Sequence, residues 1–129
     1  MIRHLASPNM PRSHLPSFPA VRAGDLLFIS GQASVDATGC LVPGTFEQQM
    51  RRSLEDLRAI LLASGSDHTL VVQPRNCVRE PGDLESFNRI YRDCFSAPYP
   101  ARTTLTRCLG EELRYETDCI AVIGGAANE

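Results

Sequence analysis

The stretch ELRYETDCIAVIGG, residues 112–125, carries the periodicity of a half-buried β-strand. Every second residue from Leu113 to Ala121 is apolar or uncharged, whereas the residues between them, from Arg114 to Asp118, are charged. Because successive side chains of a strand point to opposite faces, the pattern places one face in a core and leaves the other polar over its first half. The stretch therefore predicts a sheet that something apolar covers on one side.

Two amphipathic helices are predicted to supply that cover. Thr45 and Gln48 form a capping box, and the helix that they open ends near Gly65. Its apolar residues lie three and four positions apart, at Phe46, Met50, Leu54, Leu57 and Leu61. The second helix follows PGD (81–83), with Asp83 as its N-cap. Its apolar stripe consists of Leu84, Tyr91 and Phe95, and Asn88 lies on the same face, where a polar amide needs a partner.

Three further segments have strand composition. DLLFISGQASV (25–35) contains an apolar run that predicts cover on both faces. TLVVQPRNCV (69–78) contains Pro74 and Asn76, which predict a bulge or an edge position. ARTTLTRC (101–108) is expected to form a hairpin with residues 112–125.

The element order is strand, helix, strand, helix, strand, strand, which predicts an α+β fold with two helices packed on one face of a mixed β-sheet. We expect one domain, residues 1–129, in which residues 1–15 form an extended leader with room for one short strand. A chain of 129 residues supplies no third layer. The uncovered face of the sheet is therefore expected to pack against other subunits.

Composition excludes several classes of function. Thirteen Lys and Arg residues against fifteen Asp and Glu residues give a net charge of −2, which argues against nucleic acid as a partner. The longest apolar runs are too short for a membrane span, and the amino terminus lacks the apolar core of a secretory signal, so we expect a cytoplasmic protein. Five cysteines without a C-x-x-C pair fit neither a disulfide framework nor a zinc site, and most of them are expected to be packing residues.

Arg102 and Glu116 are the candidate catalytic pair. If the hairpin loop has the three residues 110–112, Arg102, Thr104 and Glu116 share one face, whereas an even loop puts Arg102 and Glu116 on opposite faces. A guanidinium binds a carboxylate with two parallel hydrogen bonds, and a carboxylate can position and deprotonate water. Spacing alone favours a surface arginine and a solvated strand face over a catalytic pair.

Five segments carry a resemblance to a known family: VRAGDLLFISGQ (21–32), SLEDLRAILLASGS (53–66), FNRIYRDCF (87–95), PARTTL (100–105) and LRYETDCIAV (113–122). In order and spacing they resemble the RidA/YjgF family of reactive-intermediate deaminases, over about residues 16 to 124. The resemblance implies a chorismate-mutase-like (YjgF-like) fold and a homotrimer with sites between subunits. It also implies hydrolysis of enamine or imine intermediates, such as 2-aminoacrylate, to 2-keto acids and ammonia, without a metal or cofactor.

The resemblance also implies roles for single residues. Arg102 matches the arginine that holds the substrate carboxylate, and Glu116 matches the acid that orients the attacking water. The positions that match substrate-binding residues are Ser17, Ser30, Gly31, Asn88 and Thr104. Ser17 replaces a family aromatic residue and Thr104 replaces a frequent cysteine, so the pocket wall differs and thiol chemistry is not expected.

Alternative functions stay open at this point. One is a non-catalytic trimer that binds a small carboxylate or a partner protein, and another is a pathway-specific deaminase of the aminomuconate type. Ribonuclease activity is disfavoured by the acidic balance of charges. A cysteine nucleophile is disfavoured because no histidine is placed to activate Cys108 or Cys119.

Overall fold

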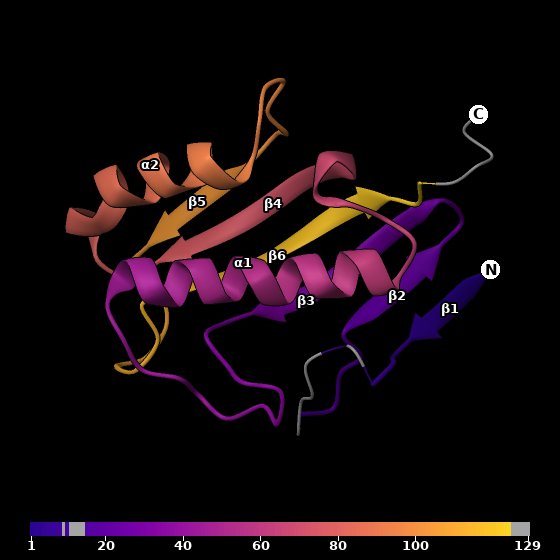
Figure 1. Ribbon diagram of the computed structural model, residues 1–129, viewed down its shortest axis with the longest axis horizontal. Coiled ribbons are helices and arrows are strands. Elements are labelled where there is room, and N and C mark those ends of the chain that lie inside the picture. Colours follow the sequence, from indigo (N-terminus) through magenta and orange to yellow (C-terminus); the bar gives the residue numbers. More distant parts are fainter. Residues whose placement is uncertain (9, 11–14, 125–129) are drawn as a thin grey trace.

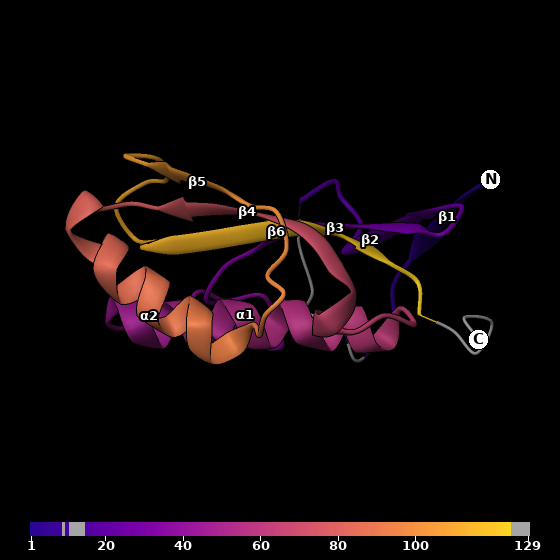
Figure 2. The same cartoon turned by 90° about the horizontal axis from the view of Figure 1, so that it is seen from above.

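The computed structural model describes residues 1–8, 10 and 15–124. Within them, six strands form one mixed sheet in the order β1-β2-β3-β6-β4-β5 (Figure 1). The strands are β1 (Ile2–Leu5), β2 (Ala20–Ala23), β3 (Leu26–Gln32), β4 (Val71–Val78), β5 (Thr103–Thr106) and β6 (Tyr115–Val122). Helices α1 (Phe46–Ala63) and α2 (Leu84–Cys94) lie on the same side of the sheet (Figure 2). The predicted fold class, a mixed sheet with two helices on one face, is confirmed.

Helix α1 begins and packs as its sequence predicts. Thr45 and Gln48 form both hydrogen bonds of the capping box, at 3.1 and 2.9 Å. The helix ends before Gly65, whose φ of 84° lies in the left-handed region that glycine adopts without strain. All five members of the predicted apolar stripe are buried. They fill the space between α1 and the central strands β3 and β6.

Strand β6 lies in the middle of the sheet and shows the predicted alternation. Tyr115, Thr117 and Cys119 are buried, and the ring of Tyr115 lies 6.1 Å from the rings of both Phe46 and Phe87, which belong to the two helices. These residues therefore face the helix layer. The residues between them, Glu116 among them, point to the opposite face of the sheet.

The predicted hairpin of residues 101–108 with residues 112–125 is wrong. Strand β5 pairs in parallel with β4, through Arg75 opposite Thr103, and β4 lies between β5 and β6. The reason is the helix that precedes β5, because a strand, helix and strand in succession return the chain parallel to its start. Residues 107–114 then carry the chain past the end of β4 to the far side of that strand, with Arg107 and Leu109 at positive φ.

Strands β4 and β3 differ in detail from expectation. The register of β4 against β6 shifts between Val71 and Gln73, so the predicted bulge is present, but β4 is an interior strand and not an edge. Asn76 is tolerated there because its side chain bonds Tyr115 and the carbonyl of Thr103. Strand β3 is shorter than predicted, and its alternate residues are exposed in the single chain.

The face of the sheet opposite the helices carries exposed apolar side chains. Leu26 and Phe28 of β3 are 42% and 41% exposed, and Leu105 of β5 is 59% exposed. Exposed apolar side chains on one face of a sheet are typical of a contact between proteins. The expected packing of this face against other subunits stays a prediction. No helix in the described part of the chain is both long and apolar enough to span a membrane.

Helix α2 and the cysteines also depart from the sequence-based expectations. Asp83 is the N-cap residue of α2 but makes no side-chain capping bond, and Phe87 and Ile90 join the buried face of the helix. Cys77 and Cys108 form a disulfide, which contradicts their expected role as free packing residues. Parallel pairing of β4 with β5 brings them together, with Cys77 opposite Leu105, and their spacing in the sequence gave no sign of it.

The expected leader contains a strand. Residues Ile2–Leu5 form β1, which pairs antiparallel with β2 at one edge of the sheet. Residues 9 and 11–14 of the leader lie outside the described residues.

Candidate functional site

Arg102 is held in place by helix α2. Its guanidinium lies 4.7 Å from the ring centre of Tyr91 and 5.0 Å from that of Phe87, and one Nη donates a hydrogen bond of 2.6 Å to Asn88 Oδ1. Within the described residues Arg102 has no carboxylate partner. The contact with Asn88 satisfies the amide that the sequence left without a partner. Contacts with two rings and one amide fix the guanidinium and leave its remaining N–H groups for a ligand.

A hollow of about 280 Å³ opens beside this guanidinium. Helix α2 contributes Asn88, Tyr91 and Arg92, which lie on one helix face at positions i, i+3 and i+4. The segment between α2 and β5 contributes Tyr99 and Pro100, together with Arg102 itself. No acidic residue lines the hollow, so its charge is positive and it suits a small anion.

Glu116 lies on the open face of the sheet, over Gly31. A Cβ on Gly31 would collide with the Glu116 carboxylate, so glycine leaves the room that this carboxylate occupies. Burial, with a smaller contribution from the neighbouring charge of Asp118, raises the pKa of Glu116 above its usual value. A carboxylate of raised pKa in a partly dry position is well suited to accept and return a proton.

Arg102 and Glu116 of one chain do not meet. The guanidinium contacts the helix layer, whereas Glu116 points away from it, and β4 separates their strands. Of the two arrangements that the sequence left open, the structure has the one with the pair on opposite faces, although no hairpin joins them. A small molecule can therefore touch both groups only if they come from different copies of the chain.

The other predicted site residues divide between the two faces. Thr104 pairs with Asn76 and lies on the helix side with Arg102. Ser30 precedes Gly31, and its Oγ donates a 2.6 Å hydrogen bond to the carbonyl of Phe18. Ser17 is exposed in the segment before β2, and the ring of the adjacent Phe18 lies 5.0 Å from that of His4. The structure thus groups Arg102 with Asn88 and Thr104, and Glu116 with Gly31.

Sequence reasoning missed three residues of the hollow, Tyr91, Arg92 and Tyr99, and also Phe87, whose ring contacts Arg102. The position of Arg92 four residues after Asn88 was the available signal, because that spacing puts both on one helix face. Tyr99 gave no signal, since it lies in an irregular segment. Among the described residues, no group of three or more His, Cys, Asp or Glu side chains is placed to hold a metal ion.

Comparison with known proteins identifies relatives along most of the chain. The family model described as endoribonuclease L-PSP matches residues 9–123. RutC family protein y4sK of Sinorhizobium fredii is 37% identical over 103 residues, which are 79% of this chain and 82% of that protein. The 2-iminobutanoate/2-iminopropanoate deaminase of Capra hircus is 32% identical over 124 residues, which are 95% of this chain and 90% of that protein.

Solved structures share the fold. RidA from an Antarctic Psychrobacter species superimposes with a TM-score of 0.85 at 26% identity, over 94% of this chain and 99% of that one. E. coli TdcF with bound serine superimposes with a TM-score of 0.83 at 27% identity, over 95% of this chain and 99% of that one. The sheet and helix arrangement described above is therefore that of the L-PSP proteins.

Proposed function

Because the chain belongs to the endoribonuclease L-PSP (RidA/YjgF) family, we propose that it is an imine deaminase, which hydrolyses 2-imino and 2-enamino acids to 2-keto acids and ammonia. The observation that carries the proposal is the guanidinium of Arg102. It is fixed by two rings and Asn88, has no carboxylate partner in the described residues and opens on a small hollow without acidic residues. The deaminase name of relatives about 30% identical supports the same reaction.

Arg102 is proposed to hold the substrate carboxylate. A planar guanidinium forms paired hydrogen bonds with a carboxylate and so fixes the orientation of the attached C2 carbon. Asn88 keeps the guanidinium of Arg102 in position, and Thr104 lies on the same side of the sheet. The serine bound by TdcF also carries a carboxylate, which supports a ligand of this class.

Glu116 of a second copy is proposed to act on the water. The carboxylate takes a proton as water attacks C2 of the protonated imine, and a neutral carbinolamine forms. It then gives this proton to the nitrogen, the C–N bond breaks and ammonia leaves, while the carboxylate accepts the hydroxyl proton as the 2-keto group forms. Gly31 gives this carboxylate room, and Ser30 and Ser17 are proposed to line the neighbouring wall.

The position of Arg102 and Glu116 on opposite faces supports an assembly in which one copy completes the site of another. The exposed Leu26, Phe28 and Leu105 offer the apolar contact that such an assembly needs. We therefore propose a homotrimer with three sites between subunits. A cytoplasmic location stays a prediction, and the relatives include a mitochondrial protein of Schizosaccharomyces pombe.

The experiment couples the purified protein to a pyridoxal-phosphate dehydratase that releases 2-aminoacrylate and follows the appearance of the 2-keto acid. The wild type is expected to accelerate the reaction beyond spontaneous hydrolysis. Arg102→Ala should remove that acceleration while light scattering shows an unchanged trimer. Wild-type activity in Arg102→Ala would sink the assignment. Wild-type activity in Glu116→Gln would show that this acid is dispensable and would remove one reason for calling the site catalytic.

Ribonuclease activity is less well supported, despite the description of the family. The chain has an excess of acidic residues, and RNA-binding surfaces are usually basic over a wide area. The hollow next to Arg102 is positive only locally.

A further inference from the structure

The hollow beside Arg102 contains a second guanidinium, that of Arg92. Arg92 lies one helical turn after Asn88 and is exposed, and it has no ion pair within the described residues. Other arginines on or near the same helix have partners: Arg89 bonds Glu47 at 3.0 Å, and Arg51 bonds Asp93 at 3.0 Å. A substrate with one carboxylate would occupy Arg102 and leave Arg92 without a counter-charge.

Two tyrosines also line the hollow. The ring centres of Tyr91 and Tyr99 are 6.3 Å apart. Tyr91 is 3% exposed, and its hydroxyl is a buried polar group without a hydrogen-bond partner in the described residues. Burial raises the pKa of Tyr91 to about 12, so this hydroxyl stays protonated at neutral pH. Because the hydroxyl itself is buried, a ligand in the hollow would meet the ring of Tyr91 and not its hydroxyl.

From these groups we propose that the hollow is selective for 2-imino acids with a second carboxylate. Arg102 holds the carboxylate next to the imine, and Arg92 pairs with the distal one. Two separate guanidinium groups favour a dianion, because each can neutralise one carboxylate. A volume of about 280 Å³ is slightly below the usual range for ligand pockets and suits a diacid of a few carbons. This inference rests on the proposed deaminase function.

The test compares diacid with monoacid imines. Flavin oxidases generate 2-iminosuccinate from aspartate and 2-iminopropanoate from alanine in situ, and the release of ammonia is followed above the spontaneous rate. We expect a kcat/KM at least about tenfold higher for the diacid, the size of one charged hydrogen bond. Arg92→Gln should lower the ratio of diacid to monoacid kcat/KM roughly tenfold. A wild-type enzyme without preference for the diacid, or an unchanged ratio in Arg92→Gln, would overturn the proposal.

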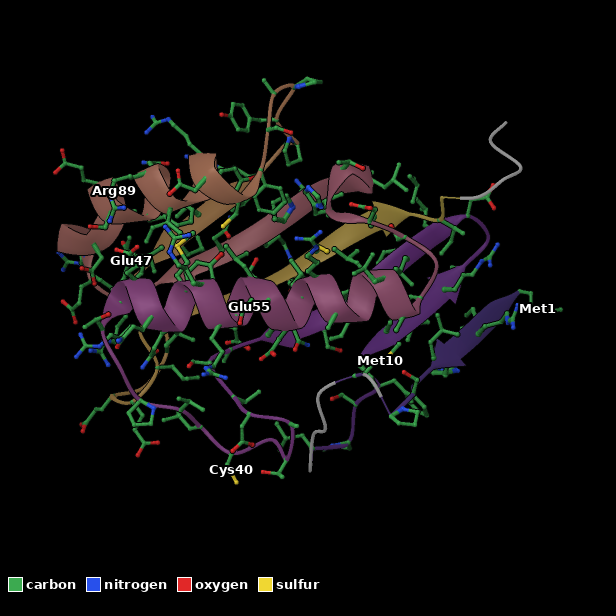
Figure 3. The ribbon with its side chains drawn as sticks, in the orientation of Figure 1. Met1, Met10, Cys40, Glu47, Glu55 and Arg89 are labelled. Atoms are coloured by element: carbon green, nitrogen blue, oxygen red, sulfur yellow. A yellow bond between two sulfur atoms is a disulfide. The ribbon has the colours of Figure 1, made fainter. Side chains whose placement is uncertain are left out.

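Arg89→Gln is the matched control, since Arg89 is also an exposed arginine of α2 and loses the same charge. Figure 3 shows Arg89 beside Glu47, to which it is ion-paired outside the hollow. The ratio should keep its wild-type value in this variant. A fall equal to that in Arg92→Gln would mean that net charge, and not the hollow, sets the preference.

Calorimetry with stable acids separates this inference from the deaminase function. If no imine is turned over, the deaminase proposal fails, but the diacid site can still be tested with succinate and propanoate. Tighter binding of succinate that is lost in Arg92→Gln would support the site. Equal affinity for the two acids, or a preference for a single-stranded oligonucleotide over succinate, would overturn it.

Discussion

Removal of one hydroxyl, in Tyr115→Phe, tests the polar contact that joins three strands of the core. Tyr115 of β6 donates a 2.6 Å hydrogen bond to Asn76 Oδ1 on β4, and Asn76 Nδ2 donates to the carbonyl of Thr103 on β5 at 3.3 Å. Tyr115 and Asn76 are 0% and 3% exposed. Thr103 is adjacent to Arg102, so the same contact helps to position the proposed carboxylate anchor.

The expected loss in free energy of unfolding is about 2 kcal/mol. Phenylalanine keeps the ring contacts of Tyr115 with Phe46 and Phe87, so the hydrophobic contribution changes little. A net hydrogen bond contributes roughly 1 kcal/mol, and a buried acceptor left without a partner costs roughly 1–3 kcal/mol. Asn76 Oδ1 would be such an acceptor, because the helix layer covers this face of the sheet.

Urea unfolding at a fixed protomer concentration measures the change, since association shifts apparent stability. Tyr99→Phe is the control, because Tyr99 is 49% exposed and should lose less than about 0.5 kcal/mol. A double-mutant cycle with Asn76→Ala should give a coupling energy of about 1–2 kcal/mol. A loss in Tyr115→Phe no larger than that of the control would refute the assigned role of the hydrogen bond.

Two further predictions concern Asp56 and the disulfide. Burial raises the pKa of Asp56 to about 6, so the folded state binds its proton more tightly than the unfolded state and stability falls as pH rises from about 4 to 6. Between pH 4 and pH 7, Asp56→Asn should therefore gain about 1–2 kcal/mol in free energy of unfolding relative to wild type, a value reduced because Asp56 is partly exposed. Urea unfolding at the two pH values measures this gain. The Cys77–Cys108 disulfide should leave three thiols, which mass spectrometry after alkylation in denaturant without reductant would count; five would contradict it.

Local patterns predicted most of the fold. The capping box at Thr45 and the apolar stripe of α1 fixed that helix, because both depend on contacts within a few residues. The alternation in residues 112–125 predicted which residues of β6 face the helices. Strand pairing was harder to predict from the sequence. The next strand in the sequence, β6, was the expected partner of β5, but helix α2 between β4 and β5 places β5 beside β4.

The candidate site also contains residues that the sequence predicted and residues that only the fold brought together. Arg102, Asn88 and Glu116 were identified from residue type and order, and the contact of Arg102 with Asn88 agrees with that identification. Arg92 and Tyr99 were missed because they belong to the hollow only through the path of the chain between α2 and β5. The Cys77–Cys108 disulfide was missed for a similar reason, since parallel pairing of β4 with β5 creates it.

The sequence by itself determined the two helices, the buried face of β6 and the candidate residues Arg102, Asn88 and Glu116, because residue type and periodicity can be read within a single segment. Tertiary structure alone decided which strands pair, and thus that Arg102 and Glu116 of one chain lie on opposite faces of the sheet. Pairing depends on contacts between segments that lie far apart in the sequence, which the periodicity of a single segment does not report. The separation of the two groups is what makes a second copy necessary for the proposed reaction.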